Sequence, residues 1–324
     1  MTEVREKLTK AEEREFAKEL VQKIGELAAL TGRKLRFMEV CGTHTMAIAK
    51  SGLKSMLPDN IRLLSGPGCP VCVTPAEMMD EILKLAGRPD IIIATYGDMI
   101  RVPGSRRGIT LRSMGAYGAA CKIVYSALDA VDLAEKNPDR QVIFLGAGFE
   151  TTAPGTAMAV RIAAGKGLKN FTVLSMLKLV EPALRALIND PEFNVQGFIC
   201  PGHVAVIIGE EGFRFLPDEY SLPAVISGFE PEDILVSVYR LARQIALNSP
   251  ELENEYTRAV SKAGNTAALE VMNEVFEPED SLWRGLGMIP KSALKLRDEY
   301  REHDAAARFG IEIKQSPLKY PCRC

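Results

Sequence analysis

The sequence predicts an α/β protein built around parallel β-sheets. Short apolar runs alternate with stretches of helical periodicity along most of its 324 residues, which is the pattern of repeated strand–helix units. The clearest run, Ile91-Ile92-Ile93, is apolar at every position, as parallel strands buried on both faces are. The composition agrees, because 47% hydrophobic and 25% charged residues are ordinary values for a globular protein.

The first elements are predicted from apolar periodicity. Residues 11–29 form an amphipathic helix whose apolar face carries Phe16, Leu20, Ile24 and Leu27. The strands expected after this helix are 35–40, 61–64, 90–95 and 122–125. Helices connect them, including one over 75–85.

The same alternation continues in the second half of the chain. Strands are expected at 141–145, 171–176 and 195–200, with helices ending at 164 and covering 182–188 and 233–247. Beyond about residue 248 the sequence becomes charged and helical. We therefore expect three units: a doubly wound, Rossmann-like unit at 31–127, a second at 128–247, and a smaller, mainly helical unit made of 1–30 and 248–324.

Charge and hydropathy exclude several classes of protein. The formal net charge of −2 gives no electrostatic reason to bind nucleic acid or an anionic membrane. No apolar run approaches the roughly 20 residues of a membrane span, and the charged N-terminus lacks a signal-peptide core. A cytoplasmic location is expected. Seven cysteines in such a chain favour metal or redox roles over structural disulfides.

A Cys-x-x-Cys pair lies in a loop rich in glycine and proline. Cys69 and Cys72 precede a predicted helix start, where Thr74, Pro75 and Glu77 match a capping box. The positive end of the helix dipole would favour the thiolate forms. The pair could be a redox dithiol or half of a four-thiolate metal site.

Cys41-Gly42-Thr43-His44 follows the strand predicted at 35–40. A soft thiolate and an imidazole three residues apart could bind iron or zinc, or His44 could act as a base for Cys41. The alternative is a buried cysteine beside a helix cap. If the first two strands are neighbours, Cys41 and the Cys69–Cys72 pair share one rim of the sheet.

Two further loops follow predicted strands. Residues 146–152 place Glu150 after a strand, but they lack the third glycine and the lysine of phosphate-binding motifs, so they predict nucleotide binding only weakly. His203 follows Pro201-Gly202 and is either functional or a hydrogen-bonded core histidine. Three other residues are given packing or surface roles: Cys121 and Cys200 in apolar strands, and His303 on a solvated helix.

The chain ends in Cys322-Arg323-Cys324. Two cysteines one residue apart do not easily form a disulfide with each other, and they are typical of paired ligands to one cluster or metal ion. Two thiolates do not complete a four-cysteine site.

Taken together, these motifs resemble the HypD family of [NiFe]-hydrogenase maturation factors. The resemblance extends from about residue 30 to the end of the chain. It is carried by 41–45, 66–72, 148–152, 201–203, 264–265, 283–287 and the final Cys-x-Cys. It implies a scaffold that holds one iron, together with a small HypC-type partner, while cyanide and carbon monoxide ligands are installed. Cyanide would come from a HypE-type partner served by a HypF-type carbamoyltransferase, and the Fe(CN)2CO unit would pass to the hydrogenase large subunit.

The resemblance also implies roles for individual residues. Cys41 is the expected iron thiolate and the Cys69–Cys72 pair the expected redox couple. The proton-handling candidates are His44, Glu150 and His203. Family members carry two more cysteines that, with Cys322 and Cys324, hold a [4Fe–4S] cluster, so the cluster set is expected to be incomplete in this chain.

The leading hypothesis is an iron-binding, redox-active assembly scaffold, not a stand-alone turnover enzyme. An alternative from another class is a freestanding thiol–disulfide oxidoreductase that uses Cys69 and Cys72. A third, a nucleotide-hydrolysing α/β enzyme, would depend on the loop at 146–152.

Overall fold

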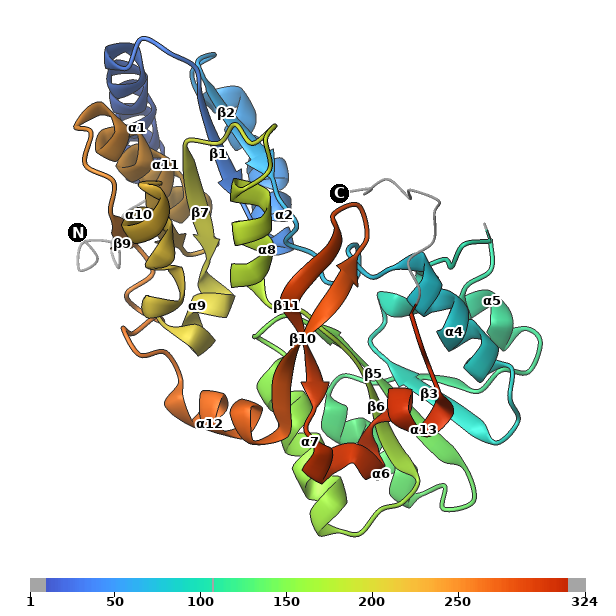
Figure 1. Ribbon diagram of the computed structural model, residues 1–324. Helices are drawn as coiled ribbons and strands as arrows, with labels where there is room; N and C mark the ends of the chain where they lie inside the picture. The colour runs from blue at the N-terminus through green and yellow to red at the C-terminus, as the bar shows by residue number, and fades with distance from the viewer. Residues whose placement is uncertain (1–9, 107, 314–324) are drawn as a thin grey trace. The chain divides into compact units, whose positions relative to one another are not determined.

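The protein divides into two compact units, each with its own parallel sheet. The computed structural model describes residues 10–106 and 108–313. Unit 1 combines Met1–Gly68 with Ile188–Thr266, and unit 2 combines Cys69–Leu187 with Ala267–Cys324. The prediction of an α/β protein with two parallel sheets is confirmed (Figure 1).

The sheet of unit 1 has five parallel strands in the order β2-β1-β7-β8-β9. Strand β1 lies between β2 and β7, with Phe37 opposite Leu63 on one side and Gly197 on the other. The sheet is therefore completed by a strand that comes about 160 residues after β1 in the chain. Its strands are β1 (Leu35–Glu39), β2 (Ile61–Ser65), β7 (Gly197–Pro201), β8 (Ala224–Ser227) and β9 (Leu252–Asn254).

The helices of unit 1 cover this sheet. Helices α1 and α11 lie side by side (Figure 1), and Leu20, Ile24 and Ala28 of α1 are buried in the same core as Leu241 of α11. The face predicted for the first helix is thus confirmed at Leu20 and Ile24. The helices are α1 (Lys10–Leu30), α2 (Gly42–Ser51), α3 (Leu53–Met56), α9 (Gly202–Ile208), η3 (Glu211–Phe213), α10 (Phe215–Tyr220) and α11 (Pro231–Ala246).

Unit 2 contains a four-stranded parallel sheet in the order β4-β3-β5-β6. Every residue of β3 is buried, as the uninterrupted isoleucine run predicts for a strand covered on both faces. The strands are β3 (Ile91–Thr95), β4 (Cys121–Ile123), β5 (Gln141–Gly148) and β6 (Phe171–Leu177).

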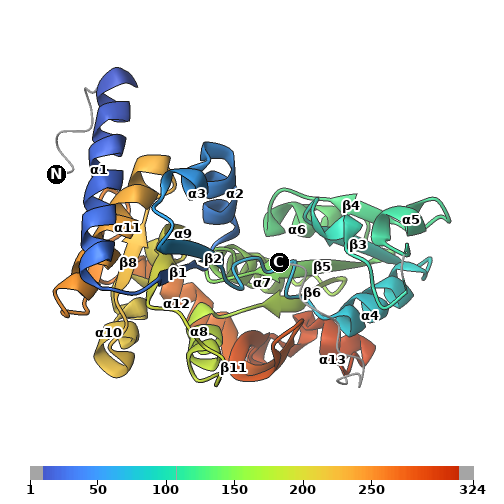
Figure 2. The same cartoon turned by 90° about the horizontal axis from the view of Figure 1, so that it is seen from above.

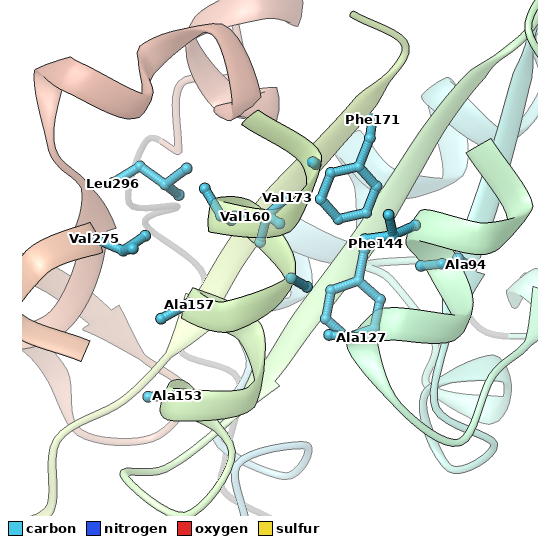
Figure 3. Packing of buried hydrophobic residues seen from close by; sticks show 14 of the residues in the cluster. Ala94, Ala127, Phe144, Ala153, Ala157, Val160, Phe171, Val173, Val275 and Leu296 are labelled. Carbon is cyan, nitrogen blue, oxygen red and sulfur yellow. The ribbon is translucent and has the colours of Figure 1, made fainter. Parts of the chain in front are cut away.

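Helices pack on both faces of the sheet in unit 2. Figure 2 shows α6 on one face and α4 with α13 on the other. In Figure 3 the small side chains of α7, among them Ala157 and Val160, lie beside the rings of Phe144 and Phe171. The helices are α4 (Ala76–Ala86), η2 (Met99–Arg101), α5 (Leu111–Gly115), α6 (Ala127–Glu135), α7 (Ala153–Gly165), α8 (Val180–Ile188), α12 (Thr266–Val275), η4 (Asp298–His303) and α13 (Ala305–Phe309).

Unit 2 also holds an antiparallel hairpin near the end of the chain. Its strands, β10 (Phe276–Trp283) and β11 (Gly287–Leu296), pair from Phe276 opposite Leu296 to Trp283 opposite Gly287, with a register shift between Glu279 and Ser281. No helix among the described residues is long and apolar enough to cross a membrane.

The structure divides the chain differently from the sequence-based expectation. The strands predicted for 31–127 are split, since β1 and β2 belong to unit 1 and β3 and β4 to unit 2. The segment 248–324, expected to be mainly helical, contributes β9 and the β10–β11 hairpin. Strand pairing joins residues far apart in sequence, and local periodicity does not encode it.

Candidate functional site

Cys41 lies where β1 ends and α2 begins in unit 1. It has an extended backbone, with φ −149° and ψ 122°, and is the residue that immediately precedes the helix. Burial raises the pKa of the Cys41 thiol, while the backbone amides of Thr43 and His44 oppose that rise. Cys41 is therefore a protonated thiol facing the start of a helix, and it needs a cation or base nearby to become a thiolate.

A glycine loop packs against the backbone of Cys41. The Gly42 N–H donates to the Gly68 carbonyl oxygen at 3.1 Å. A Cβ atom on Gly68 would lie 2.3 Å from the Cys41 nitrogen, so only glycine fits. Gly68 immediately precedes Cys69 in the sequence.

Glu39, which the sequence analysis did not single out, fixes the start of α2. Its side chain is 1% exposed. One carboxylate oxygen accepts the Cys41 N–H at 3.0 Å, and the other accepts the Thr45 hydroxyl at 2.5 Å. A signal was present, because Glu39 follows Leu35 and Phe37 on the buried face of β1.

His44 and His203 both stack on one phenyl ring. The Phe229 ring stacks on His203 with 3.9 Å between centroids and on His44 with 4.8 Å. His44 is fully buried, and its Nε2 donates to the Gly228 carbonyl oxygen at 2.8 Å. The structure thus brings together the predicted residues Cys41, His44 and His203 at one end of the unit 1 sheet.

The second ring nitrogen of His44 has no hydrogen-bond partner among the described residues. Because Nε2 donates to a carbonyl, Nδ1 carries the lone pair. Burial lowers the pKa of His44 to about 4, so the ring is neutral at physiological pH. A buried lone pair of this kind can accept a hydrogen bond or bind a metal ion.

The loop that carries Phe229 is anchored by an ion pair with one buried partner. Asp233 is fully buried and binds the partly exposed Arg258, with 2.5 Å between Oδ2 and Nη2. The Arg258 guanidinium lies over the Tyr256 ring, and this ring meets Phe229 edge to face. Sequence reasoning missed Phe229 because its ring contacts come from three segments that are far apart in the sequence.

The two cysteines of the predicted dithiol lie in unit 2 as free cysteines. The Cys72 N–H donates to the Cys69 sulfur at 3.2 Å. Burial, followed by a hydrogen bond with the Cys72 side chain, raises the pKa of Cys69 to about 12. This direction is opposite to the thiolate expected from the helix start.

The expected capping box is also absent at this helix. Helix α4 begins at Ala76 with Pro75 before it, and the Thr74 hydroxyl donates to the Pro70 carbonyl oxygen at 2.9 Å. Thr74 therefore closes the Cys-x-x-Cys loop instead of capping the helix. The helix begins one residue later than predicted, and burial decides the protonation state of Cys69.

Glu150 lies in the loop after β5 and is buried. One carboxyl oxygen accepts the Val180 N–H at 2.9 Å, and the other has no partner among the described residues. Burial raises the pKa of Glu150 to about 7, so it exchanges a proton near neutral pH. Gly148 is required for a different reason from phosphate binding, because a Cβ there would overlap the Thr152 hydroxyl at 1.5 Å.

The tip of the β10–β11 hairpin contacts both predicted loops of unit 2. The Arg284 N–H donates to the Val73 carbonyl oxygen at 2.8 Å, next to Cys72. The Trp283 and Phe149 rings lie 6.1 Å apart. The hairpin therefore connects the dithiol loop with the loop of Glu150.

The remaining predicted residues have other positions. Cys322 and Cys324 lie outside the described residues. Cys200 is buried in β7, as predicted, and Cys121 is half-buried in β4. His303 was expected on the surface but is buried, with Nδ1 bonded to the Phe171 carbonyl oxygen at 2.9 Å.

Within residues 10–106 and 108–313, no three histidine, cysteine or acidic side chains converge as a metal site.

Comparisons with known proteins agree with the motifs. A family model described as "HypD: Hydrogenase formation hypA family" matches residues 15–324. The hydrogenase maturation factor HypD2 of Bradyrhizobium diazoefficiens is 45% identical over 296 residues, covering 89% of this chain and 78% of that protein. HypD of Rhodobacter capsulatus is 44% identical over 301 residues, covering 91% and 79%. HypD of Escherichia coli is 41% identical over 291 residues, covering 90% and 78%.

Proposed function

Because the chain belongs to the HypD family of hydrogenase maturation factors, we propose that it is the scaffold on which the Fe(CN)2CO group of the [NiFe] site is assembled. The observation that supports this most is the position of Cys41 at the start of α2, the helix that also carries His44. The His44 imidazole is neutral and buried, and its Nδ1 has no hydrogen-bond partner among the described residues. A soft thiolate suits the low-spin ferrous ion that cyanide and carbon monoxide favour.

Cys41 is proposed to bind the iron cargo and to lose its proton as it does so. Its raised pKa keeps the sulfur protonated until a cation offsets the cost of the buried charge. His44, whose pKa is lowered to about 4, does not hold a proton at physiological pH, so the Cys41 proton is proposed to pass to solvent and His44 to serve as a neutral hydrogen-bond acceptor. Glu39 keeps the Cys41 backbone in place through the bond from the Cys41 N–H.

The Cys69–Cys72 pair is proposed to supply reducing equivalents during assembly. Its conversion to a disulfide releases two electrons and two protons, and Glu150 is the proposed proton-handling group of unit 2. Cys322 and Cys324 are proposed as two of the ligands of a [4Fe–4S] site. A HypC-type protein would share the iron, and a HypE-type protein, served by a HypF-type one, would donate cyanide before transfer to the large subunit.

The alternative, a freestanding thiol–disulfide oxidoreductase, is less well supported. Such enzymes attack with a thiolate of lowered pKa. Cys69 has a raised pKa instead, because of burial and the hydrogen bond with Cys72. Fast exchange with unrelated disulfides is therefore not expected.

Infrared spectroscopy tests the scaffold proposal. The protein is co-purified anaerobically with its HypC-type partner and scanned through the cyanide and carbon monoxide stretching regions. Bands of both ligands are expected in the wild type and in Cys200→Ala, which changes a packing cysteine, and their loss is expected in Cys41→Ala. If the wild-type complex with a full cluster shows no such bands, the scaffold proposal fails. Bands that persist in Cys41→Ala would exclude Cys41 as the iron ligand.

A further inference from the structure

Lys178 is a buried lysine at the end of β6 that neither the motifs nor the proposed function uses. Its side chain is 3% exposed, and its backbone N–H donates to the Gly148 carbonyl oxygen at 2.8 Å. Burial of a lysine ammonium is costly unless its hydrogen bonds are satisfied. The contacts of Lys178 therefore indicate what the surrounding structure gains from it.

Within the part of the chain that the structure describes, the side chain of Lys178 contacts the β10–β11 hairpin. Its Nζ donates to the Ser281 hydroxyl and, at 3.3 Å, to the Leu282 carbonyl oxygen. The same ammonium lies 5.6 Å from the centre of the Trp283 ring, in a cation–π contact. Among the described residues no carboxylate is within ion-pairing distance, although Glu279 is the acidic group that acts on it electrostatically.

These three contacts hold the residues just before the tip of the hairpin. The next residue, Arg284, donates its N–H to the Val73 carbonyl oxygen at 2.8 Å. Val73 directly follows Cys72, and its own N–H donates to the Cys69 carbonyl oxygen at 3.2 Å. Arg284 of the hairpin is thus hydrogen-bonded to Val73, which is joined to Cys72 by a peptide bond and to Cys69 by a hydrogen bond.

Neighbouring residues strengthen the same connection. The Leu179 N–H donates to the Ser292 carbonyl oxygen at 2.9 Å, and the Ser292 hydroxyl accepts the Trp283 indole N–H at 2.8 Å. The Val180 N–H donates to Glu150 at 2.9 Å. Consecutive residues 178–180 therefore hold the hairpin tip and the carboxyl of Glu150 together.

We propose that Lys178 is a positioning residue for the Cys69–Cys72 dithiol, acting through the β10–β11 hairpin. The inference rests on the redox role proposed above for that pair. By fixing Ser281, Leu282 and Trp283, Lys178 keeps Arg284 against Val73 and so keeps the two sulfurs within reach of each other. A looser loop has a lower effective concentration of one thiol at the other, and its disulfide forms less readily.

A redox titration of the full chain tests this assignment. The reaction is Cys69 thiol plus Cys72 thiol plus glutathione disulfide, giving the Cys69–Cys72 disulfide and two glutathione thiols. After anaerobic equilibration and alkylation, the tryptic peptide 63–84 reports the oxidised fraction by mass spectrometry, because it contains these two cysteines and no others. Lys178→Met should lower the equilibrium constant about five- to tenfold, and tenfold equals about 30 mV.

Three further variants separate positioning from general stability. Lys178→Arg keeps the cation and its donors, so it should restore most of the wild-type constant. Ser281→Ala removes one acceptor at little cost in volume and should shift the constant in the same direction by a smaller factor. Lys169→Met removes an exposed lysine paired with Glu302 in the same unit and should have no effect.

The outcomes distinguish this proposal from the function on which it rests. An unchanged constant in folded Lys178→Met and in Ser281→Ala would overturn the assignment of Lys178 and leave the dithiol role intact. If Lys178→Met does not fold, the equilibrium constant measured for Ser281→Ala alone tests the assignment of Lys178. A wild-type peptide that never forms the disulfide would contradict the redox role of the pair, and the positioning role with it.

Discussion

Two buried titratable side chains give opposite pH dependences to stability. Glu150 has a pKa raised by burial to about 7, and His44 has a pKa lowered by burial to about 4. Each is neutral where an exposed group of its kind would be charged. Both residues therefore exchange protons outside their usual pH ranges.

Glu150→Gln is expected to stabilise the protein above pH 7. Between its ordinary pKa of 4.5 and about 7, the folded state holds a proton that the unfolded state has lost, so stability falls as pH rises through this window. Above pH 7 the free energy of unfolding has fallen by its full amount, about 3 kcal/mol. Glutamine still accepts the Val180 N–H and carries no charge, so the dependence of stability on pH in this window disappears.

Urea denaturation at pH values from 4 to 8 measures this effect. Glu299→Gln, which changes an exposed carboxyl in the same unit, is the control and should follow the wild type. Identical pH slopes for wild type and Glu150→Gln would contradict the burial of an ionisable Glu150.

His44 should remain uncharged at pH 5.5, with its proton on Nε2. Its pKa of about 4 lies below the ordinary 6.5, so the unfolded state takes up a proton first as pH falls, and stability is lost between 6.5 and 4. Nitrogen-15 NMR of labelled histidine distinguishes the two ring nitrogens directly. A His44 that becomes charged near pH 6.5 would contradict the arrangement of its ring.

Sequence reasoning identified some of these residues and missed others for clear reasons. Cys41, His44 and Glu150 were predicted because polar residues that follow strands collect at one edge of a parallel sheet. Phe229 was missed because an isolated aromatic residue gives no sign of the rings it will contact. The protonation state of Cys69 was predicted in the wrong direction because burial is a tertiary property.

At the level of elements, the close approach of Gly68 to α2 makes a sharp prediction. Gly68→Ala places a Cβ 2.3 Å from the Cys41 nitrogen and should cost about 1–3 kcal/mol, because backbone must move. Gly155→Ala is the matched control, since it lies exposed in α7 with open space around it and should stabilise by about 0.5–1 kcal/mol. Thermal unfolding compares them. Equal effects of the two changes would mean that Gly68 does not contact Cys41.

The β10–β11 hairpin shows where periodicity misleads. The charged segment beyond residue 248 was assigned to helices, yet β10 alternates between more and less buried positions along its length. Pro278 and the acidic residues beside it are unusual in strands. The hairpin is stabilised instead by buried contacts such as Trp283 with Ser292, which link residues only after the chain has folded.

For the whole molecule, the separate cores of the two units predict separable unfolding. Ile24→Ala removes a fully buried side chain from unit 1 and should destabilise that unit by about 2–5 kcal/mol. Trp283, the single tryptophan, lies in unit 2 and reports only that unit by fluorescence. Denaturation followed by circular dichroism should therefore shift more than the fluorescence transition. Coincident shifts would show that the units unfold as one.

The class of fold was predictable, but its topology was not. Two parallel sheets follow from the alternation of apolar runs and helices. The assignment of strands to sheets requires β1 to pair with β7 across an intervening unit. Such pairing depends on contacts between distant segments, and a single sequence holds no local sign of it.

That interrupted order has a consequence for synthesis on the ribosome. Strand β1 emerges early, but its neighbour β7 begins about 160 residues later. At typical elongation rates this leaves the open edge of β1 without a neighbour for roughly 10–30 s. During the same interval all four strands of the unit 2 sheet are translated. The four strands of the unit 2 sheet can thus pair first on the nascent chain, although the β10–β11 hairpin of that unit is translated last. Meanwhile the half-made sheet of unit 1 needs protection from aggregation.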